Sequence, residues 1–280
     1  MSLQRNDESG AAFLLFVLGL MLVMISSVAF MQAEVPLATH QSLVQAQQQY
    51  LQRARQRLNT WYKTQAVVLD ASGNGSASPV PASGLLAAAG ISERWNAQAF
   101  VSTEQCLAAS QGNICYRNIW VAVPATSGTP PTLANNVFQP GTAQYIEVSG
   151  QPIESLLYRQ SLDQLDHIVT RIDAGYSAYE ASGGVHNINV DWFAPPPSSG
   201  CGVPGGVGPF GCSGGGFAPV SAIFPSSFSA GNSAVNAWGM TVTANNSGSP
   251  ASDTATPYTM ALESPLPWGG DILATAVEPM

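Results

Sequence analysis

An apolar run near the start of the chain limits what this protein can fold into. Residues 11–31, AAFLLFVLGLMLVMISSVAFM, contain no charged side chain and only two serines. As a helix rising about 1.5 Å per residue, this run would measure roughly 31 Å, the thickness of a bilayer's hydrocarbon core. A secretory signal would begin with basic residues and have a shorter apolar stretch, whereas the preceding MSLQRNDESG is acidic. The sequence therefore predicts one transmembrane helix, which hydropathy alone would make an uncleaved signal anchor or an ordinary single-pass helix.

A second helical pattern follows without a linker. From Leu37 to about Gln65, apolar residues recur at spacings of three, four and seven, with Gln and Arg between them. The members of this stripe are Leu43, Val44, Tyr50, Leu51, Ala54, Leu58, Trp61 and Tyr62. We expect a transmembrane and amphipathic helix over residues 11–66, about 84 Å long, with a kink or local opening near Pro36.

The charge composition excludes one class of ligand. Charged residues make up 9% of the chain, where roughly 25% is usual for soluble domains, and the net charge is -8. Four of the nine cations fall in one short segment, as Arg53, Arg55, Arg57 and Lys63. The rest of the chain is acidic and has no basic patch for neutralising phosphates, so we expect no binding to nucleic acid.

The four cysteines form two pairs that are close in sequence. Cys106 lies near Cys115, and Cys201 lies near Cys212, each pair within a polar, Gly- or Ser-rich stretch. This arrangement favours two local disulfides, although four cysteines allow three pairings, and zinc ligands or free thiols are the alternatives. Each small loop would stabilise the fold by roughly 2 to 3 kcal/mol in an oxidising compartment.

The remainder of the chain predicts an α+β head. Residues 70–84, DASGNGSASPVPASG, should end the long helix, and residues 115–125 and 144–149 read as strands separated by a Pro-rich loop at 129–141. A second helix is expected from Ile153 to about Tyr179, followed by a strand at 186–194. The apolar stripe of this helix consists of Tyr158, Leu162, Leu165, Val169, Ile172, Tyr176 and Tyr179. We expect antiparallel sheet in two lobes, residues 67–150 and 151–280.

Catalytic and metal-binding patterns are missing from the sequence. His40, His167 and His186 lie in separate segments, and none has metal-ligand spacing to another His, Cys or carboxylate pair. Asp163, Asp166 and Asp173 fit a solvated helix face. We therefore expect no enzyme, no cofactor and no metal.

A glycine-rich segment is the candidate contact loop. Residues 201–216, CGVPGGVGPFGCSGGG, lack the Lys of a phosphate loop and are bracketed by cysteines, so we interpret them as a stapled loop. Phe210 and Phe217 in or next to it are the candidate contact residues, since aromatic side chains dominate binding surfaces. Trp192 and Trp268 are further candidates, and the alternative for all four aromatic residues is that they pack under the loops.

The N-terminus resembles that of type IV pilins and pseudopilins. The shared features are a short leader ending in Gly10, an apolar run that starts at Ala11, and the amphipathic continuation. The resemblance implies that a prepilin peptidase removes residues 1–10 by cutting between Gly10 and Ala11. It also implies that the remaining helix serves first as a membrane anchor and then as the packing spine of a filament.

The C-terminus resembles the sheet of type IVb pilins. Residues 221–244 and 262–279 are most similar to the constant portion of PilV-type minor pilins of conjugative thin pili. The matching parts are an Asn-x-Trp-Gly turn before an alternating strand and a terminal strand after a Gly-Gly turn.

One departure from the family points to a special position in the filament. Leu15 is the fifth residue after the expected cut, where major pilins carry a glutamate that neutralises the terminal amine of the adjacent subunit. A subunit without this carboxylate fits poorly inside a repeating bundle, because a buried charge would stay unpaired.

The resemblance then implies a minor pilin at the tip of a type IV pilus, or fimbrium, acting in conjugation or adhesion. Its expected partners are the major pilin, other minor pilins, the prepilin peptidase and the inner-membrane assembly machinery. It would sit in the inner membrane with a periplasmic head before assembly and be extracellular afterwards. The alternatives are a secretion-system pseudopilin and an unprocessed single-pass envelope scaffold or binding protein.

Overall fold

A computed structural model describes residues 7–70, 82–181, 193, 218–220, 234–245 and 258–278. In the first helix, the described side chains are those of residues 17–24 and 41–65. The chain forms two compact units, residues 1–53 and 54–280. The fold is α+β, and the strands in its sheets pair antiparallel, as the sequence predicted.

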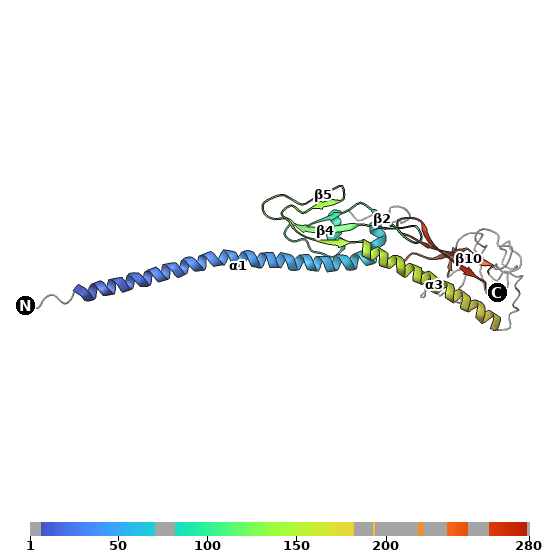
Figure 1. Ribbon diagram of the computed structural model, residues 1–280, viewed down its shortest axis with the longest axis horizontal. Helices are drawn as coiled ribbons and strands as arrows, with labels where there is room; N and C mark the ends of the chain where they lie inside the picture. The colour runs from blue at the N-terminus through green and yellow to red at the C-terminus, as the bar shows by residue number, and fades with distance from the viewer. Residues whose placement is uncertain are drawn as a thin grey trace, which may run out of the picture. The chain divides into compact units, whose positions relative to one another are not determined.

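The first helix is longer than expected. α1 (Asp7–Asp70) is drawn as one helix in Figure 1. It includes Pro36, and the residue with non-helical φ and ψ inside it is Gln65. The local opening expected near Pro36 is therefore wrong, whereas a kink with helical backbone there stays a prediction. In the second unit, Ala54, Leu58 and Tyr62 are buried at intervals of four residues. This spacing confirms the C-terminal part of the predicted stripe, whereas Leu43 is exposed.

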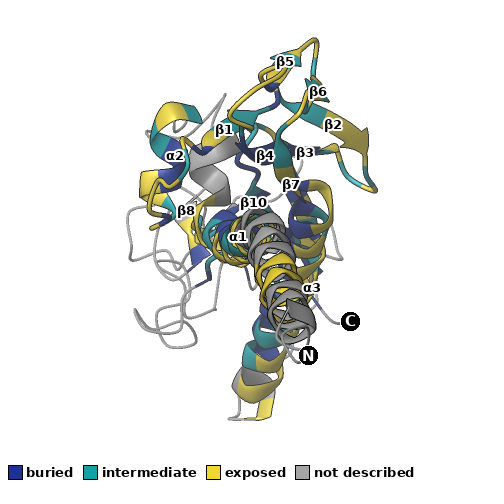
Figure 2. Cartoon of the chain, turned by 90° about the vertical axis from the view of Figure 1, so that its left-hand side faces the viewer, coloured by how far each residue is buried: buried dark blue, intermediate teal, exposed yellow. Residues whose placement is uncertain are grey.

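A first lobe forms around a three-stranded sheet. Its elements are α2 (Ala82–Ala88), β1 (Gln98–Val101), β4 (Asn118–Val123) and β7 (Gln144–Ser149), with strand order β1-β4-β7, together with residues 54–70 of α1. β4 is the central strand, and its side chains from Ile119 to Val123 are all buried (Figure 2). Because alternate side chains of a strand point to opposite faces, both faces of this sheet must be covered.

A short hairpin covers one of those faces. β5 (Thr132–Ala134) pairs with β6 (Val137–Gln139) through a two-residue turn, in which Asn135 and Asn136 both have positive φ, as a type I′ turn requires. The ring of Phe138 stacks on Trp120 of β4 with 5.4 Å between centroids. The loop predicted over residues 129–141 is therefore wrong in its middle, because the Asn-Asn pair between two short apolar segments closes a hairpin.

The other predicted elements of this lobe are mostly confirmed. β7 has the predicted limits, but the strand predicted at 115–125 is divided into β3 (Asn113–Tyr116) and β4, with Arg117 between them. β3 instead pairs with β2 (Gln105–Ala108) in a separate hairpin. The helix break predicted at 70–84 begins where α1 ends, although its last three residues already belong to α2.

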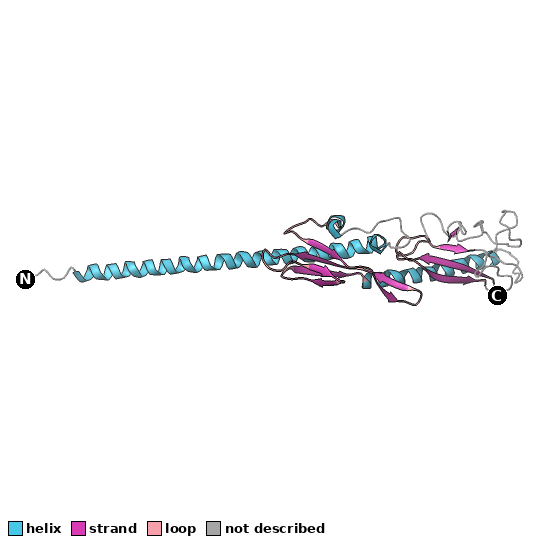
Figure 3. Cartoon of the chain, turned by 90° about the horizontal axis from the view of Figure 1, so that it is seen from above, coloured by secondary structure: helices cyan, strands magenta, loops and turns pink. Residues whose placement is uncertain are grey.

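A second lobe packs one helix against a four-stranded sheet. Its elements are α3 (Gln151–Ala181), β8 (Ala218–Pro219), β9 (Thr243–Asn245), β10 (Thr259–Pro265) and β11 (Asp271–Val277), with sheet order β11-β10-β9-β8. In Figure 3 a helix runs alongside the strands nearest the C-terminus. Leu165, Ile168 and Ile172 on α3 contact a core that includes Met260 and Ile272. The predicted second helix and the terminal strand after Gly269 and Gly270 are confirmed. The strand predicted at 186–194 lies outside the described residues apart from Phe193, which is in a turn.

Candidate assembly and contact surfaces

A continuous apolar surface is exposed on α1. Leu18, Leu20, Met21 and Leu22 are each between 44% and 64% exposed, and every side chain position from 17 to 24 faces solvent. Eight consecutive residues make more than two helical turns, so the exposed surface surrounds the helix rather than forming one stripe. Soluble monomers rarely expose large contiguous apolar patches, and such patches mark contacts with proteins or membranes.

The predicted membrane span is described only in part. No stretch of helix among the described residues combines the length and apolarity that crossing a bilayer requires. Of residues 11–31, the side chains of 17–24 are the described ones. Gly10, Ala11 and Leu15 lie within the α1 backbone, and their side chains fall outside the described residues.

The predicted basic segment lies on an exposed part of α1. Arg53, Arg55, Arg57 and Lys63 are all exposed. The guanidinium of Arg57 donates a hydrogen bond to the carbonyl of Gly90 beyond α2. This arginine therefore ties α1 to the segment that follows α2, within the second unit of the chain.

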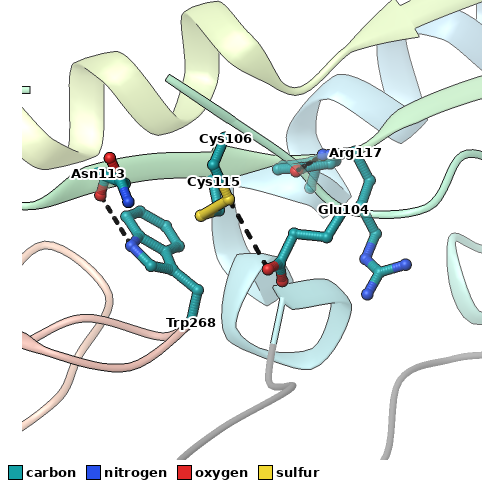
Figure 4. The surroundings of a disulfide bond; sticks show 7 residues. Glu104, Cys106, Asn113, Cys115, Arg117 and Trp268 are labelled. Atoms are coloured by element: carbon teal, nitrogen blue, oxygen red, sulfur yellow. Dashed lines mark hydrogen bonds between the residues drawn. A yellow bond between two sulfur atoms is a disulfide. The ribbon is translucent and has the colours of Figure 1, made fainter. Parts of the chain in front are cut away.

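One of the two predicted disulfides lies in the described residues. Cys106 on β2 is bonded to Cys115, its direct partner across the β2–β3 hairpin (Figure 4). The side chain of Cys106 is exposed and that of Cys115 is buried. Cys201, Cys212, Phe210 and Phe217 lie outside the described residues.

The metal-ligating cluster next to this disulfide is unsuited to hold an ion. Among the described residues, Glu104, Cys106 and Cys115 bring a carboxylate oxygen and two sulfurs within 4.8 Å of one another. Because the sulfurs are joined to each other, neither is available as the thiolate that binds a metal. We therefore interpret the cluster as a disulfide with a carboxylate neighbour.

The hairpin that carries this disulfide also makes contacts beyond its own two strands. The turn of the β2–β3 hairpin contacts the second lobe, where Ser110 and Gln111 hydrogen-bond the hydroxyl of Tyr158 on α3. The indole N–H of Trp268 donates to the carbonyl of Asn113 at 2.8 Å (Figure 4). Sequence reasoning missed these contacts. The signal that could have revealed the hairpin is the Ser-Gln-Gly-Asn turn midway between two cysteines.

The Asn-x-Trp-Gly segment forms a tight turn with a buried polar centre. The Asn236 side-chain oxygen accepts hydrogen bonds from the backbone N–H groups of Trp238 and Met240, and its amide nitrogen donates to Ser264 and Pro265. All four hydrogen bonds that an asparagine amide can make are therefore formed. Gly239 completes the turn with φ of +78°.

Two tryptophans join this turn to the β10–β11 hairpin. The rings of Trp238 and Trp268 meet edge to face, with centroids 5.4 Å apart. The indole N–H of Trp238 donates to the buried carboxyl of Glu154 on α3 at 2.8 Å. Trp268, a candidate contact residue, is half-buried and engaged with Trp238 and Asn113, which agrees with the alternative that it packs under a loop.

A pocket between α2 and β1 offers little chemistry. Its volume is about 340 Å³, and its lining includes Leu86, Ala97, Phe100 and one acidic residue, Glu93. The lining residues include no His or Cys to act as base or nucleophile.

Of the predicted surface acids, Asp163 and Asp166 are exposed, whereas burial raises the pKa of Asp173 above its ordinary value. His167 is exposed on the same helix.

Comparison with known proteins gives no match: no protein-family model, curated protein or solved structure is similar to this chain.

Proposed function

We propose that this chain is a type IV pilin-like minor subunit, positioned at the tip of a pilus, which assembles through α1 and contacts surfaces through its head. The observation that carries this proposal is the apolar surface at residues 17–24, exposed around the whole helix. A bilayer before assembly, and neighbouring subunit helices afterwards, would each cover such a surface. Binding and assembly, rather than catalysis, are then the protein's activity.

The continuity of α1 supports a spine rather than a detachable anchor. One helix carries the apolar surface at 17–24 and also the buried residues Ala54, Leu58 and Tyr62 of the second unit. A filament packed through its N-terminal helices needs subunits in which an apolar N-terminal segment continues as helix into the head.

Position 15 supports a place at the tip. Leu15 cannot neutralise a terminal amine on the neighbouring subunit, so repeated insertion along a shaft would leave that charge unpaired in an apolar bundle. A subunit inside the shaft has neighbours on both sides, whereas a terminal subunit has none on one side. The terminal subunit therefore needs this charge pairing in only one direction. The partners under this proposal are the major pilin, other minor pilins and a prepilin peptidase that cleaves after Gly10.

Cleavage is the first experiment. The full chain is co-expressed in membranes with a prepilin peptidase, and its intact mass is measured. We expect the mass to fall by that of residues 1–10, and a Gly10→Leu variant should keep its full mass in the same cells. An unchanged wild-type mass would overturn the proposal and favour an uncleaved envelope scaffold.

Location is the second experiment. Leu15→Glu should increase incorporation along the filament shaft, because the new carboxylate supplies the missing partner for the terminal amine. Leu18→Glu is the matched control, since it adds the same charge at a different position of the helix. Immunogold counts along the filament and at its ends distinguish the outcomes. If the ratio of tip to shaft labelling is the same in wild type and in Leu15→Glu, the placement at the tip is contradicted.

A further inference from the structure

The β2–β3 hairpin extends from the first half of the chain onto the second lobe. Its turn, residues 109–112, meets the hydroxyl of Tyr158 on α3 in three ways. The backbone N–H of Gln111 donates to this hydroxyl at 3.0 Å, the carbonyl of Gln111 accepts from it at 2.9 Å, and the Ser110 hydroxyl lies 3.2 Å away. One tyrosine hydroxyl therefore contacts two residues of the turn, Ser110 and Gln111.

The side chain of Gln111 pairs with the edge of the C-terminal sheet. Its amide nitrogen donates to the carbonyl of Leu273 at 2.9 Å, and the backbone N–H of Leu273 donates to the Gln111 amide oxygen at 2.6 Å. These are the two bonds that a residue of a neighbouring antiparallel strand would form. β11 is the edge strand of its sheet in the described residues, so Gln111 takes the place of one residue of a further strand.

Apolar side chains of the hairpin also contact the second lobe. Ala109 and Ile114 pack against the core of the second lobe, and Trp268 donates to the carbonyl of Asn113. Neither of these contacts belongs to the first lobe's own sheet, which is completed by β1, β4 and β7. The hairpin is therefore a separate element that connects the first lobe to the second lobe.

The disulfide lies at the middle of this element. Cys106 and Cys115 are directly opposed, with two pairs of residues on the turn side, Leu107 with Ile114 and Ala108 with Asn113. A two-stranded hairpin has marginal stability by itself in water. A covalent bond between its strands restricts the open state and so favours the closed one.

We propose that the disulfide-closed β2–β3 hairpin is a redox-controlled latch: the Cys106–Cys115 bond holds the Gln111 turn against Tyr158 and Leu273, and its reduction separates the turn from the second lobe while both lobes stay folded. Each lobe keeps its own core, the first around β4 and the second around α3, so losing the latch removes only contacts between them. The latch does not depend on the proposed pilus function.

The reaction is a thiol–disulfide exchange. A dithiol reductant in its thiolate form attacks Sγ of the exposed Cys106, giving a mixed disulfide and releasing Cys115 as a thiolate that takes up a proton. The second thiol of the reductant then closes its own disulfide and releases Cys106. Two electrons and two protons pass to the protein, which ends with two thiols.

Hydrogen exchange of the full chain in detergent micelles tests the latch. The chain is compared with the variant Cys106→Ser/Cys115→Ser, which opens this bond and leaves Cys201 and Cys212 in place. We expect exchange in the segments 109–116 and 271–275 to become roughly 100-fold faster, as loss of the loop constraint predicts. Segments 119–123 and 165–172 should change less than about threefold.

Two further variants make the result decisive. Gln111→Leu keeps the disulfide and removes the pairing with Leu273, so exchange in 271–275 should rise while 119–123 stays protected. Cys201→Ser/Cys212→Ser is the matched cysteine control and should leave both latch segments unchanged. Uniformly faster exchange across all segments would show that the disulfide supports the global fold instead, and unchanged exchange in 109–116 would show that the hairpin closes without it. Either result overturns the latch.

Discussion

The amide N–H of Gly150 donates to the carbonyl of Arg117 at 3.0 Å, and this bond joins the start of α3 to the end of the β2–β3 hairpin. The same place is shared by α1, because the Tyr62 hydroxyl accepts from the backbone N–H of Arg117 at 3.2 Å. A Cβ added at Gly150 would lie 2.3 Å from the Tyr62 hydroxyl and 2.4 Å from the Arg117 carbonyl. Three segments therefore meet where only glycine fits.

Gly150→Ala should destabilise the head by about 1 to 3 kcal/mol, the usual cost of overpacking, measured by urea unfolding in detergent. Because the Tyr62 hydroxyl is the nearest atom, the double variant Gly150→Ala/Tyr62→Phe should lose less than the sum of the single changes. Additive losses would mean that the backbone moves away from the new methyl group and that the ring is not the obstacle.

The two tryptophans should differ sharply when replaced by phenylalanine. Trp238→Phe leaves the buried Glu154 carboxyl without its indole donor and should cost about 2 to 3 kcal/mol. Trp268→Phe removes a neutral hydrogen bond at an exposed carbonyl and should cost about 1 kcal/mol or less. Thermal unfolding of both variants provides the comparison, and equal losses would show that the Trp238 indole is unimportant for Glu154.

Phe138 should hold the β5–β6 hairpin onto the sheet. Its ring contacts Phe100, Trp120 and Tyr145, each with 5.3 or 5.4 Å between centroids. Phe138→Ala should cost about 2 kcal/mol and weaken the near-UV circular dichroism of the stacked Trp120. Val137→Ala is the matched control, because Val137 is 60% exposed and its truncation should stay within about 0.5 kcal/mol. A similar spectral change in both variants would contradict the assignment.

Glu263 should make a small, pH-dependent contribution to stability. Burial, and then the negative charge of Asp271, raise the pKa of Glu263 above its ordinary value. In the folded state this carboxyl holds its proton to a higher pH than in the unfolded state, so its contribution falls as pH rises from the ordinary pKa through the folded one.

The free energy of unfolding of Glu263→Gln should therefore equal that of the wild type at low pH. Above the folded-state pKa of Glu263, the variant should be the more stable of the two. We expect a difference of only about 0.3 kcal/mol, because solvent screens a partly exposed group. Unfolding in urea at a series of pH values measures it. Asp271→Asn should shrink the difference, since it removes one of the two causes. A difference that is the same at every pH would contradict the assigned shift.

Periodicity predicted the elements whose own residues decide their structure. α3 follows from its stripe because one face of the helix is buried along its length, and β7 follows from alternation in the segment QYIEVS. The hairpin β5–β6 was missed because the three prolines within residues 129–141 predict a loop, whereas Asn135 and Asn136 specify the turn itself. The sequence therefore contained the signal for this turn, but the whole segment was interpreted as loop.

The contacts between distant segments could not be predicted. Nothing in the sequence near Gln111 indicates that its amide pairs with Leu273, since that pairing depends on how two lobes meet. The same holds for Trp238 with Glu154, which are 84 residues apart. Cysteine spacing found the disulfide, but its role depends on Tyr158, which periodicity could identify only as an apolar-stripe position.

The burial of Ala54, Leu58 and Tyr62 determines how the protein can be shortened for crystallisation. A recombinant version that starts after Tyr62 would lose all three of these buried side chains, including the hydroxyl that accepts a hydrogen bond from the Arg117 amide. One that starts between residue 25 and Ala54 would discard the apolar surface at 17–24 and retain every residue of the second unit. The useful truncation point therefore lies inside the helix, several turns before its end.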